Sequence, residues 1–162
     1  MTYSAFESTK HEGAGAAEFD VANRVFLRLY QSSNLMHKVG ARFMSEFGAT
    51  TQQWAVLGAL ARPAAKSGMT VKELIEFLLL TRQNLTPVLD RLEGREWIER
   101  IGDAEDGRIR RIRLTGQGRD TWSRMQRAIE GFHAAALNGF SLDDRVHLYR
   151  LLDRLKVKLG SL

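Results

Sequence analysis

The chain has 162 residues, 44% hydrophobic and 27% charged, which is enough for one folded domain with a sizeable core. Its net charge of +5 suits a protein that binds a polyanion, but charge alone does not identify nucleic acid as the partner. The chain has no cysteine, which excludes disulfides and thiol chemistry, and we find neither a membrane-spanning run nor a secretory signal. We therefore expect a cytoplasmic protein that is not bound to a membrane.

The chain is expected to begin with a flexible arm over residues 1–19, rich in small and polar residues. From residue 20 to about residue 47, apolar side chains recur at helical spacing, and Gly48 is expected to end that helix. A further helix is predicted over residues 52–61, capped by one of the two threonines before it.

Two short helices and a hairpin are predicted next. Thr70 and Glu73 have the spacing of a capping box, which predicts a helix beginning at Thr70. Another helix is expected from Thr81 to about Glu93. The β-branched residues and bracketing turn residues over about 97–114 favour a β-hairpin.

Two longer helices are predicted at the end of the chain, from about residue 116 to 137 and from 142 to 159. The fold class is therefore mainly α with a small β-hairpin wing. We expect a single domain over residues 20–162, with a winged helix-turn-helix at about 50–115.

Two short helices joined by a tight turn and followed by a basic hairpin have the element order of a winged helix-turn-helix. In that arrangement a helix fits the DNA major groove while the hairpin reaches an adjacent groove. Polar side chains that pair with base edges or phosphates crowd the first turns of the second helix. They are Thr81, Arg82, Gln83, Asn84 and Thr86. The alternative is a solvated polar face, as in a winged-helix module that binds another protein without specific DNA binding.

The hairpin adds basic residues. Arg108, Arg110 and Arg111 lie in a run without acids and are predicted to bind DNA, although strand alternation places some of them on opposite faces. Pro87 conflicts with a helix that starts at Thr81, because it removes a backbone hydrogen bond. Either the helix is kinked there or its regular part starts later, with Asn84 as the cap. We expect DNA contacts to lie N-terminal to Pro87.

These motifs resemble those of the MarR-type transcriptional regulators. The family's wing pattern is D-P-x-D-R-R followed, after three residues, by V-x-L-T. This chain has DAEDGR at residues 103–108 and IRLT at residues 112–115. The stretch LTRQNLTPVLDRLEGREWIER is similar to the family's recognition helix and first wing strand.

The resemblance implies a homodimer whose terminal helices, about 20–47 and 116–160 here, intertwine with those of a second copy. Two wings would then grip a pseudo-palindromic operator in double-stranded DNA. By the same resemblance Asp106 braces the wing and Arg108 enters the minor groove. Gly107 replaces the family's first Arg, and Ala104 replaces its Pro. The apolar residues over 146–159 are also compatible with an ordinary intramolecular core.

The resemblance further implies a repressor that is released from DNA by a small effector, such as a phenolic or aromatic carboxylate. Aromatic and cationic side chains suited to such a ligand are Tyr30, His37, Arg42, Phe43 and Trp54. The histidines lack ligand spacing and there are no thiols, so no metal is expected. No nucleophile elbow, phosphate loop or dinucleotide fingerprint occurs. We therefore expect neither a cofactor nor an enzyme.

Overall fold

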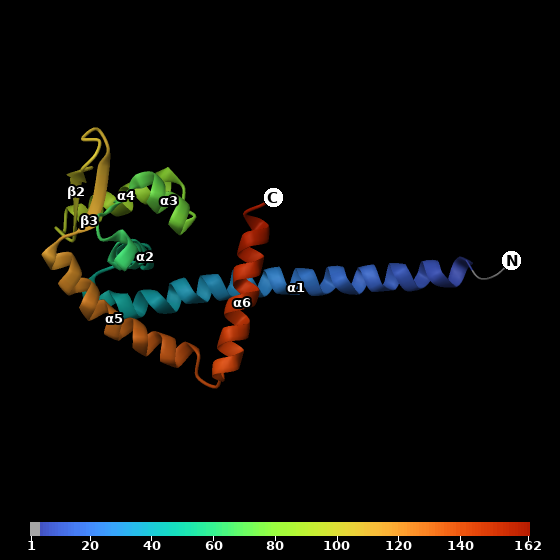
Figure 1. Ribbon diagram of the computed structural model, residues 1–162. Helices are drawn as coiled ribbons and strands as arrows, with labels where there is room; N and C mark the ends of the chain where they lie inside the picture. The colour runs from blue at the N-terminus through green and yellow to red at the C-terminus, as the bar shows by residue number, and fades with distance from the viewer. Residues whose placement is uncertain (1–3) are drawn as a thin grey trace. The chain divides into compact units, whose positions relative to one another are not determined.

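A computed structural model describes residues 4–162, with side chains from residue 15 onward. The chain divides into two compact units, the first ending at Arg42 and the second running from Phe43 to Leu162. Helix α1 extends over Ser4–Met44 (Figure 1). The helix start expected near residue 20 is therefore wrong, since the alanines and glutamate just before it favour helix. Residues 1–3 of the expected arm lie outside the described residues, and mobility of residues 4–19 stays a prediction.

The second unit begins with a tight connection. A 3-10 turn, Ser45–Phe47, ends at Gly48, whose φ of 58° lies in the left-handed region that glycine adopts without strain. Thr50 then caps α2, Thr51–Ala61, because its hydroxyl accepts the N–H of Gln53 while the Gln53 side chain accepts the N–H of Thr50. The structure thus has both the predicted helix end at Gly48 and the predicted threonine cap of the next helix.

A three-stranded antiparallel sheet supports the wing, with strand order β1-β3-β2. Strands β2, Ile98–Gly102, and β3, Arg110–Leu114, form the predicted hairpin. Strand β1, Met69–Thr70, was not predicted and pairs Met69 with Ile112 of β3. Helices α3, Val71–Leu78, and α4, Arg82–Glu93, lie between β1 and β2 in the sequence. The fold class is thus confirmed: a mainly helical chain with a small β wing.

The hydrophobic core lies where α2, α3 and α4 meet the sheet and the start of α5, Gly116–Ala136. Each large aliphatic side chain fully buried there contributes about 1.5–3 kcal/mol relative to exposure. The largest fully buried side chains are those of Val56, Leu57, Leu74, Leu85, Leu89, Leu92, Ile98, Ile112, Thr121 and Met125. This core fixes the positions of α4 and the hairpin.

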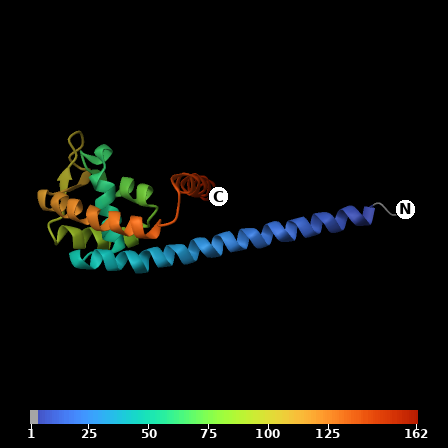
Figure 2. The ribbon, with the colours of Figure 1, turned by 90° about the horizontal axis from the view of Figure 1, so that it is seen from below.

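The last helix, α6, spans Leu142–Leu159 and contains no buried residue. Figure 2 shows that it stands apart from α2, α3, α4 and the sheet. Many of its apolar side chains are exposed, Leu148 and Leu152 among them. Among the described residues, no helix is long and apolar enough to cross a membrane.

Candidate nucleic-acid interface

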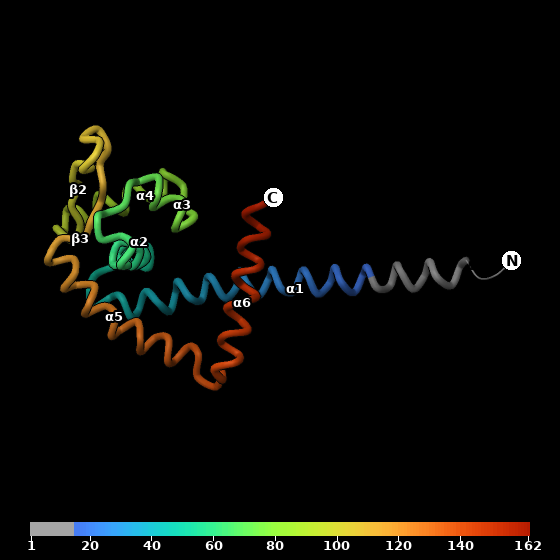
Figure 3. Tube along the Cα trace, in the orientation of Figure 1, coloured from blue at the N-terminus to red at the C-terminus, as the bar shows by residue number. Residues whose placement is uncertain are grey.

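Helices α3 and α4 form a helix-turn-helix, and the tube in Figure 3 follows the short turn between them. Thr70 caps α3 through a capping box with Glu73, as predicted. Leu79 ends α3 in the left-handed conformation, with φ 53°. Thr81 then caps α4, its hydroxyl accepting the N–H of Asn84 at 3.3 Å. The turn is therefore closed at both ends by local hydrogen bonds.

One face of α4 is buried and the other is exposed. Leu85, Val88, Leu89 and Leu92 pack into the core. The polar residues singled out from the sequence are all exposed, namely Thr81, Arg82, Gln83, Asn84 and Thr86. Amphipathic packing thus holds α4 in place and presents its polar first turns outward.

Pro87 lies inside α4. Since α4 begins at Arg82 with Thr81 as its cap, the alternative with Asn84 as the cap is wrong. Proline has no N–H, so the carbonyl of Gln83 receives no helical hydrogen bond from it. The hydroxyl of Thr86 donates to the carbonyl of Arg82 at 2.9 Å. The helix therefore accommodates the proline without moving its start.

The tip of the wing extends beyond α4 (Figure 1). It is closed by Asp106, whose carboxylate accepts the N–H of Arg108 at 2.9 Å and whose carbonyl accepts the N–H of Ile109. The side chains of Arg108 and Arg110 are exposed, and neither forms an ion pair within the described part of the chain. Both guanidinium groups are therefore available to an external anion.

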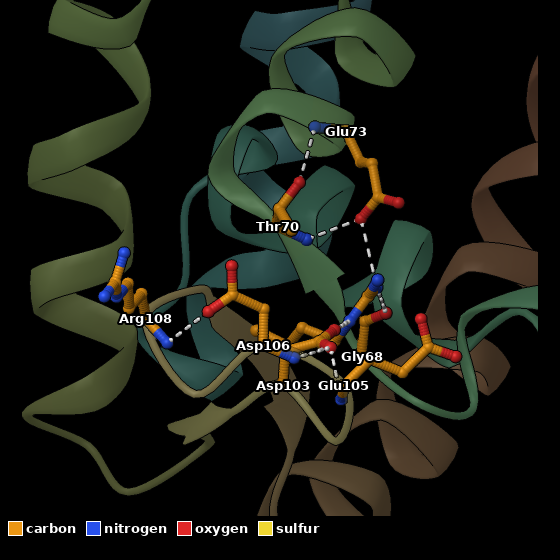
Figure 4. Close-up of polar contacts among 8 residues, drawn as sticks. Gly68, Thr70, Glu73, Asp103, Glu105, Asp106 and Arg108 are labelled. Atoms are coloured by element: carbon orange, nitrogen blue, oxygen red, sulfur yellow. Dashed lines mark hydrogen bonds and ion pairs between the residues drawn. The ribbon is translucent and has the colours of Figure 1, made fainter.

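Arg111 has a different environment. Its guanidinium donates to the carboxylate of Asp103, to the carbonyl of Gly68 at 3.1 Å and to the carboxylate of Glu73 at 3.3 Å (Figure 4). Asp103 in turn accepts the N–H groups of Glu105 and Asp106. These donors join the wing to the N-terminus of α3, so Arg111 differs from Arg108 and Arg110, and its assignment to DNA stays a prediction.

This ion cluster shifts three pKa values. The hydrogen bond from Arg111, followed by the N–H groups of Glu105 and Asp106, lowers the pKa of Asp103 to about 2. The same pairing raises the pKa of Arg111. The Thr70 N–H is the main cause of the lowered pKa of Glu73. All three groups are therefore charged at neutral pH.

Sequence reasoning missed two residues that position the interface. Asp103 braces the base of the wing, whereas Asp106 orders only its tip. Arg100 of β2 pairs with Asp90 at 2.8 Å and with Glu93 at 3.2 Å, which connects the hairpin to the C-terminal half of α4. Charge and strand alternation placed Arg100 on the hairpin, but could not reveal its partners.

The residues predicted for an effector fall in both units. Tyr30, His37 and Arg42 lie on α1, and Tyr30 is exposed. Phe43 and Trp54 belong to the second unit, where Phe43 contacts Phe132 edge to face with ring centroids 5.4 Å apart. A site formed by all five residues stays a prediction. Among the residues that the structure describes, no cluster of metal-ligating side chains occurs.

A helix-turn-helix with an exposed polar face is followed by a hairpin on which Arg108 and Arg110 form no ion pair within the described residues. These features define the winged-helix class of DNA-binding proteins. A model of the MarR family matches residues 47–109. The transcriptional activatory protein BadR from Rhodopseudomonas palustris is 40% identical over 150 residues, covering 90% of this chain and 86% of BadR. The chain belongs to the MarR family of transcriptional regulators, which also confirms that it is not an enzyme.

Solved structures agree on the fold. A MarR/EmrR family regulator from Acinetobacter sp. ADP1 superposes with a TM-score of 0.78 at 20% identity, covering 88% of this chain and 99% of the other. A mutant MarR from E. coli complexed with operator DNA superposes with a TM-score of 0.70 at 22% identity, covering 78% and 89%. The winged-helix architecture predicted from the sequence is thus shared with these proteins.

Proposed function

We propose that this regulator binds a specific operator in double-stranded DNA through the first turns of α4 and the tip of the wing. The observation that carries the proposal is the exposed cluster of Thr81, Arg82, Gln83, Asn84 and Thr86 on a helix whose opposite face is buried. Arg82 suits guanine edges, while Gln83 and Asn84 suit adenine edges. The mutant MarR from E. coli, which has the same fold, was solved in complex with operator DNA.

In this proposal the wing contacts the phosphate backbone and the minor groove of the DNA. Arg108 is held next to the ordered turn at Asp106 and has no internal acid partner in the described chain, so it is assigned to the minor groove. Arg110 is assigned to phosphate. Arg111 is assigned to positioning the wing, because its guanidinium is already paired.

The test is DNA binding measured by fluorescence anisotropy over a range of salt concentrations. Arg108→Ala should weaken binding to every duplex and reduce the salt slope by about 1, whereas Asn84→Ala should relax sequence preference at a cost of about 1–3 kcal/mol. Arg127→Ala removes an exposed charge on α5 and serves as the control. If an operator-length duplex is not bound at low salt, the winged module is an interaction domain for another protein.

We further propose that a small effector controls DNA binding, with an aromatic carboxylate as the class of ligand. Trp54 supports this, because its indole Nε1 is buried and has no hydrogen-bond partner within the described residues. A ligand oxygen would satisfy that donor. Thermal-shift screening of aromatic acids should give a hit whose shift is lost in Trp54→Phe.

The direction of control has two candidates. Release from DNA by the effector would make the protein a repressor, as the family resemblance implies. The relative BadR is named a transcriptional activatory protein, which favours activation by this chain as the second candidate. Transcription from an operator-bearing promoter in vitro, with and without the protein, distinguishes the two by the sign of the change.

A homodimer completes the proposal. Apolar side chains are exposed along both α1 and α6, Phe26 and Leu35 on the former and Leu148 and Leu152 on the latter. Exposed apolar rows of this extent on terminal helices indicate surfaces that another chain covers. A second copy would also supply a second α4 and wing for a pseudo-palindromic operator.

A further inference from the structure

A cavity of about 350 Å³ lies where the end of α2 meets the end of β3 and the start of α5. Its walls include the apolar side chains of Leu60, Leu114 and Trp122. No residue of α4 or of the wing tip takes part in the lining. The cavity is therefore separate from the surface assigned to DNA.

The charged residues that line this cavity are all cations. They are Arg62, Lys66, Arg113 and Arg119. Two of them have partners elsewhere: Arg62 stacks on the ring of Phe77 at 3.5 Å, and Arg113 pairs with Glu99 at 2.7 Å. Lys66 and Arg119 form no ion pair anywhere in the described residues. Like charges gathered around a hollow repel one another, and an anion there would relieve the repulsion.

Arg119 gives a second reason to expect an anion. It lies near the N-terminus of α5, where the helix dipole disfavours a cation, and the first turn of α5 contains no acid. One of its nitrogens donates to the carbonyl of Leu114 at 2.8 Å, which holds the guanidinium at the cavity. The other guanidinium donors of Arg119 have no partner among the described residues.

Trp122 forms a fixed apolar wall. A Cβ atom at Gly58 of α2 would lie 2.9 Å from the Trp122 ring, so the indole packs directly on the backbone of α2. The cavity volume is at the lower end of the range found for sites that bind small organic ligands. The space suits a compact body carrying one anionic group.

We propose that this cavity binds a small organic anion. Its carboxylate or phosphate group lies between Lys66 and Arg119, and its compact apolar body lies against Trp122. This site is distinct from Trp54 and does not depend on the proposed DNA binding.

Isothermal titration calorimetry tests the proposal with 2-naphthoate, phenyl phosphate and inorganic phosphate as separate probes. We expect at least one aromatic probe to bind, and to bind about tenfold more tightly than inorganic phosphate, because only the aromatic probes contact Trp122. The stronger aromatic probe identifies the preferred anionic group. Failure of both aromatic probes to bind, or equal affinity for inorganic phosphate, would overturn the site.

Variants of the cavity lining test whether the aromatic probe binds in this cavity. The double variant Lys66→Gln, Arg119→Gln should weaken the aromatic probe at least about tenfold, and Ser123→Glu, which adds a negative charge to the lining, should do the same. Arg127→Gln, at an exposed position of α5 outside the lining, should change affinity less than about twofold. Operator affinity of the double variant should be unchanged. If probe binding survives both lining variants, these cations do not form an anion site. A fall in duplex binding with the double variant would contradict the separation of this cavity from the DNA-binding surface.

Discussion

Leu79 combines two unfavourable features, a left-handed backbone with φ 53° and a side chain that is 73% exposed. The left-handed conformation costs a residue with a Cβ about 1–2 kcal/mol, and exposure offers little packing in return. Leu79→Gly should therefore raise the free energy of unfolding by about 1 kcal/mol, measured by urea denaturation. Leu79→Ala keeps the Cβ and should not stabilise. Equal stabilisation by the two variants would show that the backbone is not the cause.

Asp103 has a pKa of about 2 in the folded protein, below its usual 3.8, because Arg111 donates to its carboxylate. Its contribution to stability is therefore complete above about pH 4 and is lost as the pH falls towards 2. Asp103→Asn should unfold at lower urea concentration at pH 7, and its deficit should shrink between pH 4 and pH 2. Glu105→Gln removes a neighbouring carboxylate without an ion pair in the described residues, and should show a smaller pH-dependent deficit.

At the scale of elements, α4 contains a proline where an ordinary helical residue would donate a hydrogen bond. Pro87→Ala should restore the bond to the carbonyl of Gln83 and raise the free energy of unfolding by about 1–3 kcal/mol. Pro63→Ala is the matched control, because Pro63 lies at the start of a 3-10 turn where no such bond is lost. Urea denaturation of both variants is the measurement. A loss of stability in Pro87→Ala would show that the rigid ring outweighs the missing bond.

Helices that depend on residues close together in the sequence could be predicted from the sequence alone. The capping box of Thr70 and Glu73 depends on residues three apart, and the hydrophobic stripe of α4 depends on helical periodicity. Strand β1 could not be predicted, because two residues carry no periodicity and its existence depends on pairing with β3. The partner of Arg111 on α3 lies 38 residues away, so the sequence showed its charge but not its role.

At the scale of the whole molecule, the helix α6 has no buried residue although it is rich in leucine and valine. Most of the stability of a helix in a protein comes from packing of its apolar face, so we expect the apolar side chains of α6 to be covered by another surface. The proposed homodimer supplies that cover, so sedimentation equilibrium should give twice the chain mass at micromolar concentration.

Leu148 and Leu152 lie one helical turn apart on α6 and are 41% and 43% exposed. Replacing both by Glu should shift the sedimentation equilibrium towards monomer, because burying a carboxylate in the dimer interface is costly. The same variant should bind the operator more weakly, because a single winged module contacts only half of a palindrome. Arg150→Glu introduces the same charge at an exposed polar position of α6 and is the matched control. The core of the winged module contains no residue of α6, so near-ultraviolet circular dichroism from its tryptophans should be preserved. A double variant that remains dimeric would show that α6 is not the surface joining the two copies.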